Sequence, residues 1–280
     1  MNIQIGLDRD IDRAREIIQS YFSDRRIKIE EKNYDFRSIF NIDFVKSKSL
    51  KEIYNRVANM ILDLILNIYS KDIIYKQLGN NFNEFNGHEK RQIVEISSKI
   101  LLDKNNFLTE KEYINNQIKR HIMDIPSIFI DGFIKFRLRE LDFFINLVID
   151  KGIEEFTAEK EYREFIKILQ YFVDVQEPKY NLVNLFFEEN DFKLLDERNN
   201  EINKDFFREI LSEIDHSDIG MDDILISTLI VIAPKHLIIH LDGKDEEEDV
   251  IKIITNVFRD RVYFCLGCDK CNNRIRIKKR

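Results

Sequence analysis

The sequence has few of the residues that punctuate or cross-link a chain: three cysteines, three prolines, eight glycines and no tryptophan. Three thiols cannot build the disulfide framework that stabilises many small secreted proteins. The prolines and glycines are scattered, so no Pro-rich or Gly-rich linker separates domains. Domain boundaries therefore have to be read from changes in the hydrophobic period.

A long apolar run is also missing. The longest, Ile224 to Ala233, has ten residues, whereas a membrane-spanning helix needs about 20. Asp8, Asp10 and Asp12 stand where a secretory signal needs an apolar core. We therefore expect a cytoplasmic protein without a membrane span. In that reducing compartment, clustered cysteines favour metal binding or redox chemistry over structural disulfides.

Known catalytic signatures are missing as well. The sequence contains no P-loop, dinucleotide-binding fingerprint, nucleophile elbow or kinase motif. It therefore indicates no nucleotide cofactor, and an enzymatic function has no positive signal. The net charge of −7 gives the chain no general attraction for nucleic acid or anionic lipid, so any such binding has to be local.

The hydrophobic pattern divides the chain into three regions. Residues 1–49 predict a small strand–helix–strand element, because the alternating segments NIQIGL and RIKIE flank a helical apolar face at residues 11–21. Residues 50–177 have the period of helices, interrupted at GNNFNEFNGHE, DKNNFLTE and DIPS. Residues 178–280 return to a mixture of strands and helices with a Cys-rich tail.

The last region carries the most specific pattern. YNLVNLFFEENDFKLLDERNNEI predicts a hairpin, and a short helix from Asp205 and an apolar helix at 222–233, ended by Pro234, follow it. The strands HLIIHL and RVYFC then flank a helix with an acidic first turn. Strand, helix, strand predicts a parallel crossover, which brings the ends of strands 236–241 and 262–265 to one edge of a sheet.

Together these patterns predict a mixed, helix-rich α/β fold. A long helical middle adjoins a small sheet made from the C-terminal strands, and the strands of the first 49 residues are candidates to join that sheet. Helix should exceed strand severalfold, and the three regions can form one globular unit.

All three cysteines lie in one motif, C-x-x-C-x-x-C, at Cys265, Cys268 and Cys271. Thiolates at this spacing can turn back on one ion and supply three of the four ligands of tetrahedral zinc. The spacing resembles the start of a ferredoxin motif, but Ile275 stands where the fourth cysteine would be. Zinc is therefore favoured over an iron–sulfur cluster, with one ligand still to be found.

His240 is the best candidate for the fourth ligand. It lies at the end of the strand that the parallel crossover brings beside Cys265. His236 starts the same strand, and four residues of strand place the two rings about 13 Å apart, too far to share an ion. An alternative is that a second subunit shares the site, which would make self-association, or an unidentified protein partner, part of the function.

Two other functions use the same segment. Five basic side chains follow the cysteines and favour thiolate, so the thiols could act directly in a redox sensor or enzyme. The same charges could bind nucleic acid through phosphate, although the tail has no aromatic residue and the rest of the chain is acidic. The basic residues are Arg274, Arg276, Lys278, Lys279 and Arg280.

A carboxylate metal site in the helical middle is disfavoured. Glu155, Glu159, Glu161 and Glu164 lie in one helix, but a di-iron bundle needs two Glu-x-x-His pairs and the chain has one, Glu213 with His216. Glu155, with Lys160, Arg163 and Lys167, is expected on the solvent face of a helix. Its buried face is expected to be made of Ile153, Phe156, Phe165, Ile168, Leu169 and Phe172.

Four phrases over roughly residues 126 to 271 carry a family resemblance: GFIKFRLREL, EFTAEKEYREFIKILQYFVDVQEP, LISTLIVIAPKHLIIH and DRVYFCLGCDKC. In this order they resemble the YtxC family of sporulation proteins of endospore-forming Firmicutes. The resemblance implies a cytosolic protein of a spore former that is connected with sporulation. It supplies no activity, cofactor or catalytic residue, so no site residue follows from it.

Overall fold

The computed structural model describes residues 1–23, 27–35, 37–44, 49–187, 191–202, 220–241 and 248–268. The chain forms two compact units, Met1–Glu159 and Lys160–Arg280. The three-part division read from the sequence, with boundaries after residues 49 and 177, stays a prediction. The helix-rich α/β class is confirmed, in the form of two small mixed sheets with many helices.

The first unit contains a four-stranded sheet in the order β2-β3-β1-β4. Its strands are β1 (Asn2–Leu7), β2 (Ile27–Tyr34), β3 (Arg37–Phe44) and β4 (Ser127–Phe129), with helix α1 (Ile11–Tyr21) between β1 and β2. Strands β1 and β3 are antiparallel, and β1 and β4 are parallel. The N-terminal strands thus form a sheet of their own with β3 and β4, two strands that the sequence reading had not identified.

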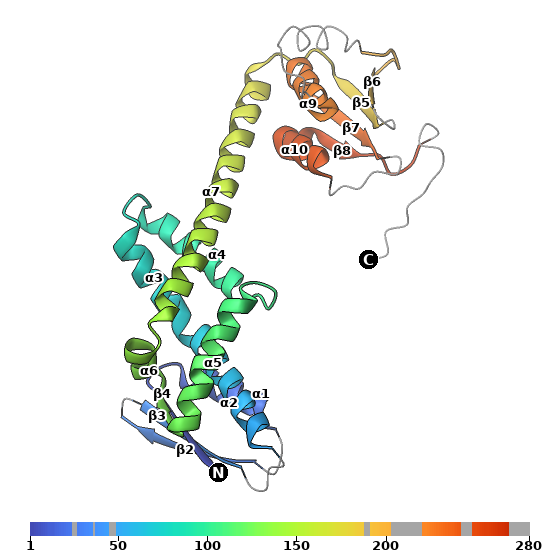
Figure 1. Cartoon of the computed structure of the whole chain (residues 1–280). Helices are drawn as coiled ribbons and strands as arrows, with labels where there is room; N and C mark the ends of the chain where they lie inside the picture. The colour runs from blue at the N-terminus through green and yellow to red at the C-terminus, as the bar shows by residue number, and fades with distance from the viewer. Residues whose placement is uncertain are drawn as a thin grey trace. The chain divides into compact units, whose positions relative to one another are not determined.

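The rest of the described part of this unit is mainly helical, and the sheet lies at one end of the group of helices (Figure 1). They are α2 (Leu50–Leu64), the π-helical turn η1 (Ile65–Tyr69), α3 (Ser70–Asn81), α4 (Gly87–Leu102), α5 (Leu108–Asp124), α6 (Ile130–Arg137) and the first half of α7 (Glu140–Val175). Asn86 caps α4 through a capping box with Glu89, which explains the break predicted before it. Sheet and helices share one hydrophobic core.

The second unit contains a sheet in the order β6-β5-β7-β8. The strands are β5 (Leu182–Phe187), β6 (Phe192–Asp196), β7 (His236–His240) and β8 (Val262–Phe264). The antiparallel β5–β6 pairing confirms the predicted hairpin, and the parallel β7–β8 pairing confirms the predicted crossover. The short helix expected from Asp205 lies outside the described residues.

Helices α9 (Met221–Ile232) and α10 (Asp249–Phe258), the 3-10 turn η2 (Arg259–Arg261) and the last part of α7 also belong to the described part of this unit. Helix α9 ends where Ala233 adopts a left-handed conformation, directly before Pro234. Leu237 and Ile239 of β7 pack in one core with both helices. Because strand side chains alternate, His236, Ile238 and His240 point to the opposite face of the sheet.

Helix α7 corrects one expectation. Phe165, Ile168 and Phe172, expected in its buried face, are 48%, 55% and 47% exposed. The helix instead buries Ile166 and Val173, which lie two turns apart on one face, in the core of the second unit. An apolar period shows which side chains share a face, but burial depends on which of those rows another element contacts.

Within the described residues, none of the helices combines the length and the apolar character that a membrane span requires.

A close helix contact gives the first prediction. A Cβ atom at Gly152 of α7 would collide with Ser97 Oγ of α4 and lie 3.3 Å from the Ser97 Cα. Gly152→Ala should therefore lower the free energy of unfolding by roughly 1–3 kcal/mol through overpacking, despite the better helix propensity of alanine. Denaturant unfolding measures the change.

Gly79→Ala is the matched control, because a Cβ atom at this helical glycine of α3 meets no atom within 4 Å. It should stabilise the protein by about 0.5–1 kcal/mol. Combining Gly152→Ala with Ser97→Gly should cost less than the sum of the two single changes, because the side-chain atoms of Ser97 that meet the new Cβ are then gone. Equal effects of the two single Gly→Ala changes would contradict the contact.

Candidate metal centre

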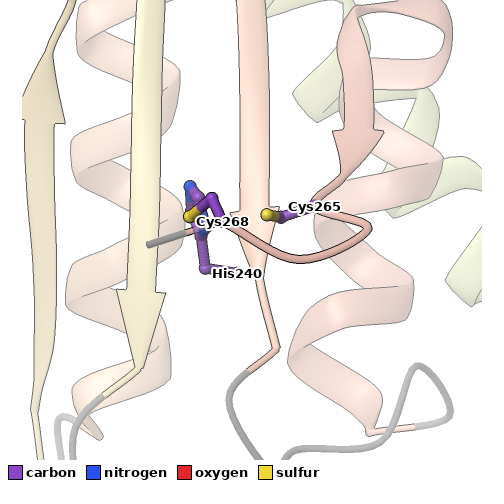
Figure 2. Close-up of side chains that lie close together, drawn as sticks. All are labelled: His240, Cys265 and Cys268. Carbon is purple, nitrogen blue, oxygen red and sulfur yellow. Dashed lines mark hydrogen bonds between the residues drawn. The ribbon is translucent and has the colours of Figure 1, made fainter. Parts of the chain in front are cut away.

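The end of β7 and the residue after β8 lie side by side. Pairing of Ile239 with Phe264 continues into a hydrogen bond from the backbone N–H of Cys265 to the carbonyl oxygen of Ile239, at 2.9 Å. His240 and Cys265 are therefore neighbours at the carboxyl edge of the sheet, as the sequence predicted. Figure 2 shows the two side chains there.

The chain then turns back and brings Cys268 over His240 (Figure 2). Leu266 is 96% exposed at the outside of the turn, and Gly267 has a φ of 127°, a value that L-residues rarely adopt. The turn leaves the Cys268 Sγ 3.7 Å from the His240 Nδ1. Glycine thus provides the reversal that a C-x-x-C segment needs to direct both sulfurs to one place.

Asn184 of β5 sets the tautomer of His240. Its side-chain oxygen Oδ1 lies 3.1 Å from His240 Nε2. An amide oxygen can only accept a hydrogen bond, so Nε2 carries the proton and donates it. The other ring nitrogen, Nδ1, then has a lone pair, and it is this atom that faces Cys268. A hydrogen bond of this kind on the far nitrogen is typical of histidines that bind metals.

Phe186 of β5 holds the imidazole ring in place. Phe186 pairs with His240 across the β5–β7 ladder, and the two rings stack with centroids 4.0 Å apart and planes at 12°. His240 is only 3% exposed, although it lies on the sheet face opposite α9 and α10. The ring is therefore fixed by a neighbour on one side and by a hydrogen bond at its edge.

The three ligand atoms of His240, Cys265 and Cys268 all lie within 4.8 Å of one another. Ideal tetrahedral zinc with bonds of about 2.1 Å to nitrogen and about 2.3 Å to sulfur places nitrogen and sulfur about 3.6 Å apart. The Nδ1–Sγ distance of 3.7 Å is close to this value. One nitrogen and two sulfurs form a donor set that suits zinc better than hard cations such as magnesium.

The other residues considered from the sequence fall in different places. Cys271, the basic residues of the tail, Glu213 and His216 lie outside the described residues. His236 is exposed at the start of β7, and its ring lies 5.8 Å from that of Tyr263. It takes no part in the described cluster, in agreement with its distance from His240 along the strand.

Asn184 and Phe186 were missed by the sequence reading. Both lie in the predicted hairpin, at alternate positions of one strand, so a shared face could be inferred. Their contact with His240 requires the register of β5 against β7, which pairs strands separated by about fifty residues of chain. No local pattern in the sequence contains that register.

A family model described as the YtxC-like family matches residues 55–263 of the chain. The match begins in α2, well before the phrases that first indicated the resemblance, and ends within β8. It therefore includes His240 and stops two residues before Cys265.

Among curated proteins, the chain is similar to the "Uncharacterized protein YtxC" of Bacillus subtilis (strain 168). The two are 26% identical over 162 residues, which cover 55% of this chain and 54% of that protein. The chain thus matches about half the length of this relative. No solved structure gives a significant match.

The hydrogen bond from His240 to Asn184 gives the second prediction. In metal-free protein near neutral pH, nitrogen-15 NMR of the imidazole should show the Nε2–H tautomer of His240, because Asn184 accepts that proton. Asn184→Leu should remove this preference and cost about 1–3 kcal/mol of folding free energy, since it leaves a buried N–H without its acceptor.

His236, exposed on the same strand, serves as the internal control and should show a mixture of tautomers in both proteins. A predominant Nδ1–H tautomer of His240 would contradict the assignment, because Nε2 would then have no proton to donate to Asn184.

Proposed function

We propose that this chain, which belongs to the YtxC-like family, carries a structural zinc site in its C-terminal unit. The proposed ligands are His240, Cys265, Cys268 and Cys271. The observation that carries the proposal is the convergence of an imidazole nitrogen and two sulfurs within 4.8 Å. They come from the ends of two neighbouring strands and a turn. Cys271 continues the same three-residue step and would supply the fourth ligand.

The donor set favours zinc over the other metals considered. Structural zinc sites take four ligands from cysteine and histidine, whereas an all-cysteine iron–sulfur cluster needs a fourth thiolate that Ile275 does not provide. The Nε2–H tautomer supports the proposal, since it presents the Nδ1 lone pair to the two sulfurs. Burial of the ring lowers competition from water.

A site with four protein ligands has no open position for substrate, so the proposed role is non-enzymatic. Zinc would tie the segment after β8 to the end of β7 and thereby stabilise the sheet edge. We place this protein in the cytosol of a spore former and connect it with sporulation, on the strength of the family resemblance in its sequence. A protein partner, or a second copy of the chain, would then use the stabilised surface.

A thiol function is the competing proposal, and one contact favours it. A neutral histidine nitrogen 3.7 Å from Cys268 Sγ can accept the thiol proton and so promote thiolate formation. This function needs a sulfur that oxidises reversibly, whereas a structural zinc site protects its sulfurs from oxidation. Alkylation rates measured across pH, with and without zinc, separate the two.

The third prediction concerns metal content. Protein made in zinc-replete medium and purified without oxygen should contain one zinc ion per chain and be colourless. Chelation should lower its melting temperature, because at free zinc a thousandfold above Kd the metal contributes about 4 kcal/mol of stability. Cobalt substitution should give the absorption of a tetrahedral site with sulfur ligands.

Cys268→Ser, Cys271→Ser and His240→Ala should each weaken zinc binding strongly, and Asn184→Leu by about 10–100-fold. His236→Ala is the matched control on the same strand and should bind zinc as the unaltered chain does. Protein without metal whose melting temperature is unchanged by chelation would refute the proposal. A bound metal that survives Cys271→Ser would instead show that another group supplies the fourth ligand.

A further inference from the structure

A surface cavity of about 480 Å³ lies in the first unit, far along the chain from the cysteines. Helices α3, α6 and α7 line it, together with Arg139 in the short connection before α7. Small-molecule sites in proteins typically measure about 300–1,000 Å³. The cavity is therefore large enough for a metabolite.

The lining combines two apolar side chains with many groups that form hydrogen bonds. The apolar side chains are Ile73 of α3 and Ile134 of α6. Helix α3 turns one face to the cavity through positions 76, 77, 80 and 81, and three of these four residues carry side-chain amides. Amide side chains both donate and accept, which is typical of sites that recognise hydroxyl, amino and oxyanion groups.

Positive charge gathers at this cavity without matching negative charge. Lys76, Lys135 and Arg139 line it, and in the described part of the chain no carboxylate oxygen lies within 4 Å of their charged nitrogens. Asp142 is the acidic residue of the lining, and it accepts a hydrogen bond from Gln77 Nε2 at 2.9 Å. The cavity thus has three cations against one anion.

An adjoining hollow of about 200 Å³ shows the contrast. It shares Ile73, Lys76 and Ile134 with the cavity, and its own arginine, Arg9, pairs with Asp72 at 2.6 Å. The positive charge at that end is therefore neutralised. An anion would be attracted to the end near Lys135 and Arg139.

Two amide oxygens beside the cavity also lack partners. Gln77 Oε1 and Asn146 Oδ1 are buried, and no group in the described residues donates a hydrogen bond to either. A buried polar atom left without a partner costs about 1–3 kcal/mol. Both oxygens can therefore accept a hydrogen bond from a bound molecule, and both belong to residues that line the cavity.

We propose that this cavity binds a small phosphate monoester that also carries hydroxyl or amino groups. Arg139 can bind two phosphate oxygens through its planar guanidinium, and Lys76 and Lys135 add point charges. Hydroxyl or amino groups of the same molecule would donate to Gln77 and Asn146. The proposal is independent of the zinc site, because all its residues lie in the unit Met1–Glu159.

The test is isothermal titration of the full chain as purified with glycerol 3-phosphate, ribose 5-phosphate and O-phosphoserine. Inorganic phosphate and glycerol are the control ligands: the first represents the phosphate group of an ester, and the second represents its hydroxyl-bearing part. At least one ester should bind ten times more tightly than inorganic phosphate. Arg139→Gln and Lys135→Gln should each weaken that binding at least tenfold, whereas Lys99→Gln, an exposed lysine on α4, should not.

Asn146→Leu tests recognition of the hydroxyl or amino groups of the ester separately from recognition of its phosphate. It should reduce binding of the ester to that of inorganic phosphate and leave inorganic phosphate unaffected. Melting temperatures of all variants without ligand check that each one folds. If none of the three esters binds more tightly than inorganic phosphate, or if Lys99→Gln weakens binding as much as Arg139→Gln does, the proposal is overturned.

Discussion

The parallel pairing of β7 with β8 is the interaction on which the C-terminal site depends. It brings His240, which precedes helix α10 in the sequence, and Cys265, which follows it, to one edge of the sheet. The hydrogen bond from the backbone N–H of Cys265 to the carbonyl oxygen of Ile239 extends the pairing past the last residue of β8. A slip of one residue would turn the side chain of Cys265 to the other face of the sheet. The pairing of β5 with β7 then adds the two groups that hold His240, one through a hydrogen bond and one by stacking.

Sequence reasoning succeeded where a local pattern decides the structure. The hairpin, the helix ended by Pro234 and the parallel crossover all follow from period and from breaker residues, and the crossover alone places His240 beside Cys265. It failed where the structure depends on contacts between segments that are far apart in the sequence. Strand β4 has only three residues and exists because β1 offers it an edge. Phe165 of α7 stays exposed because the core of the second unit takes in Ile166 from the neighbouring row instead. Register between β5 and β7 has the same long-range origin.

The two candidate sites differ in chemistry and in their relation to the family. The cluster at β7 and β8 offers a buried imidazole and two half-buried sulfurs, whereas the cavity of the first unit offers cations and amides. The family match covers every residue of the cavity lining and His240, but ends before Cys265 and Cys268.

Helix α7 has a further consequence for how the chain reaches this structure. It is continuous from Glu140 to Val175, and the division between the two units falls inside it. Phe156 packs in the core of the first unit, and Ile166 and Val173 in that of the second. Starting a helix is costly, while adding residues to an existing one is not. Whichever unit folds first therefore supplies a helical nucleus to the other, which has only to extend it.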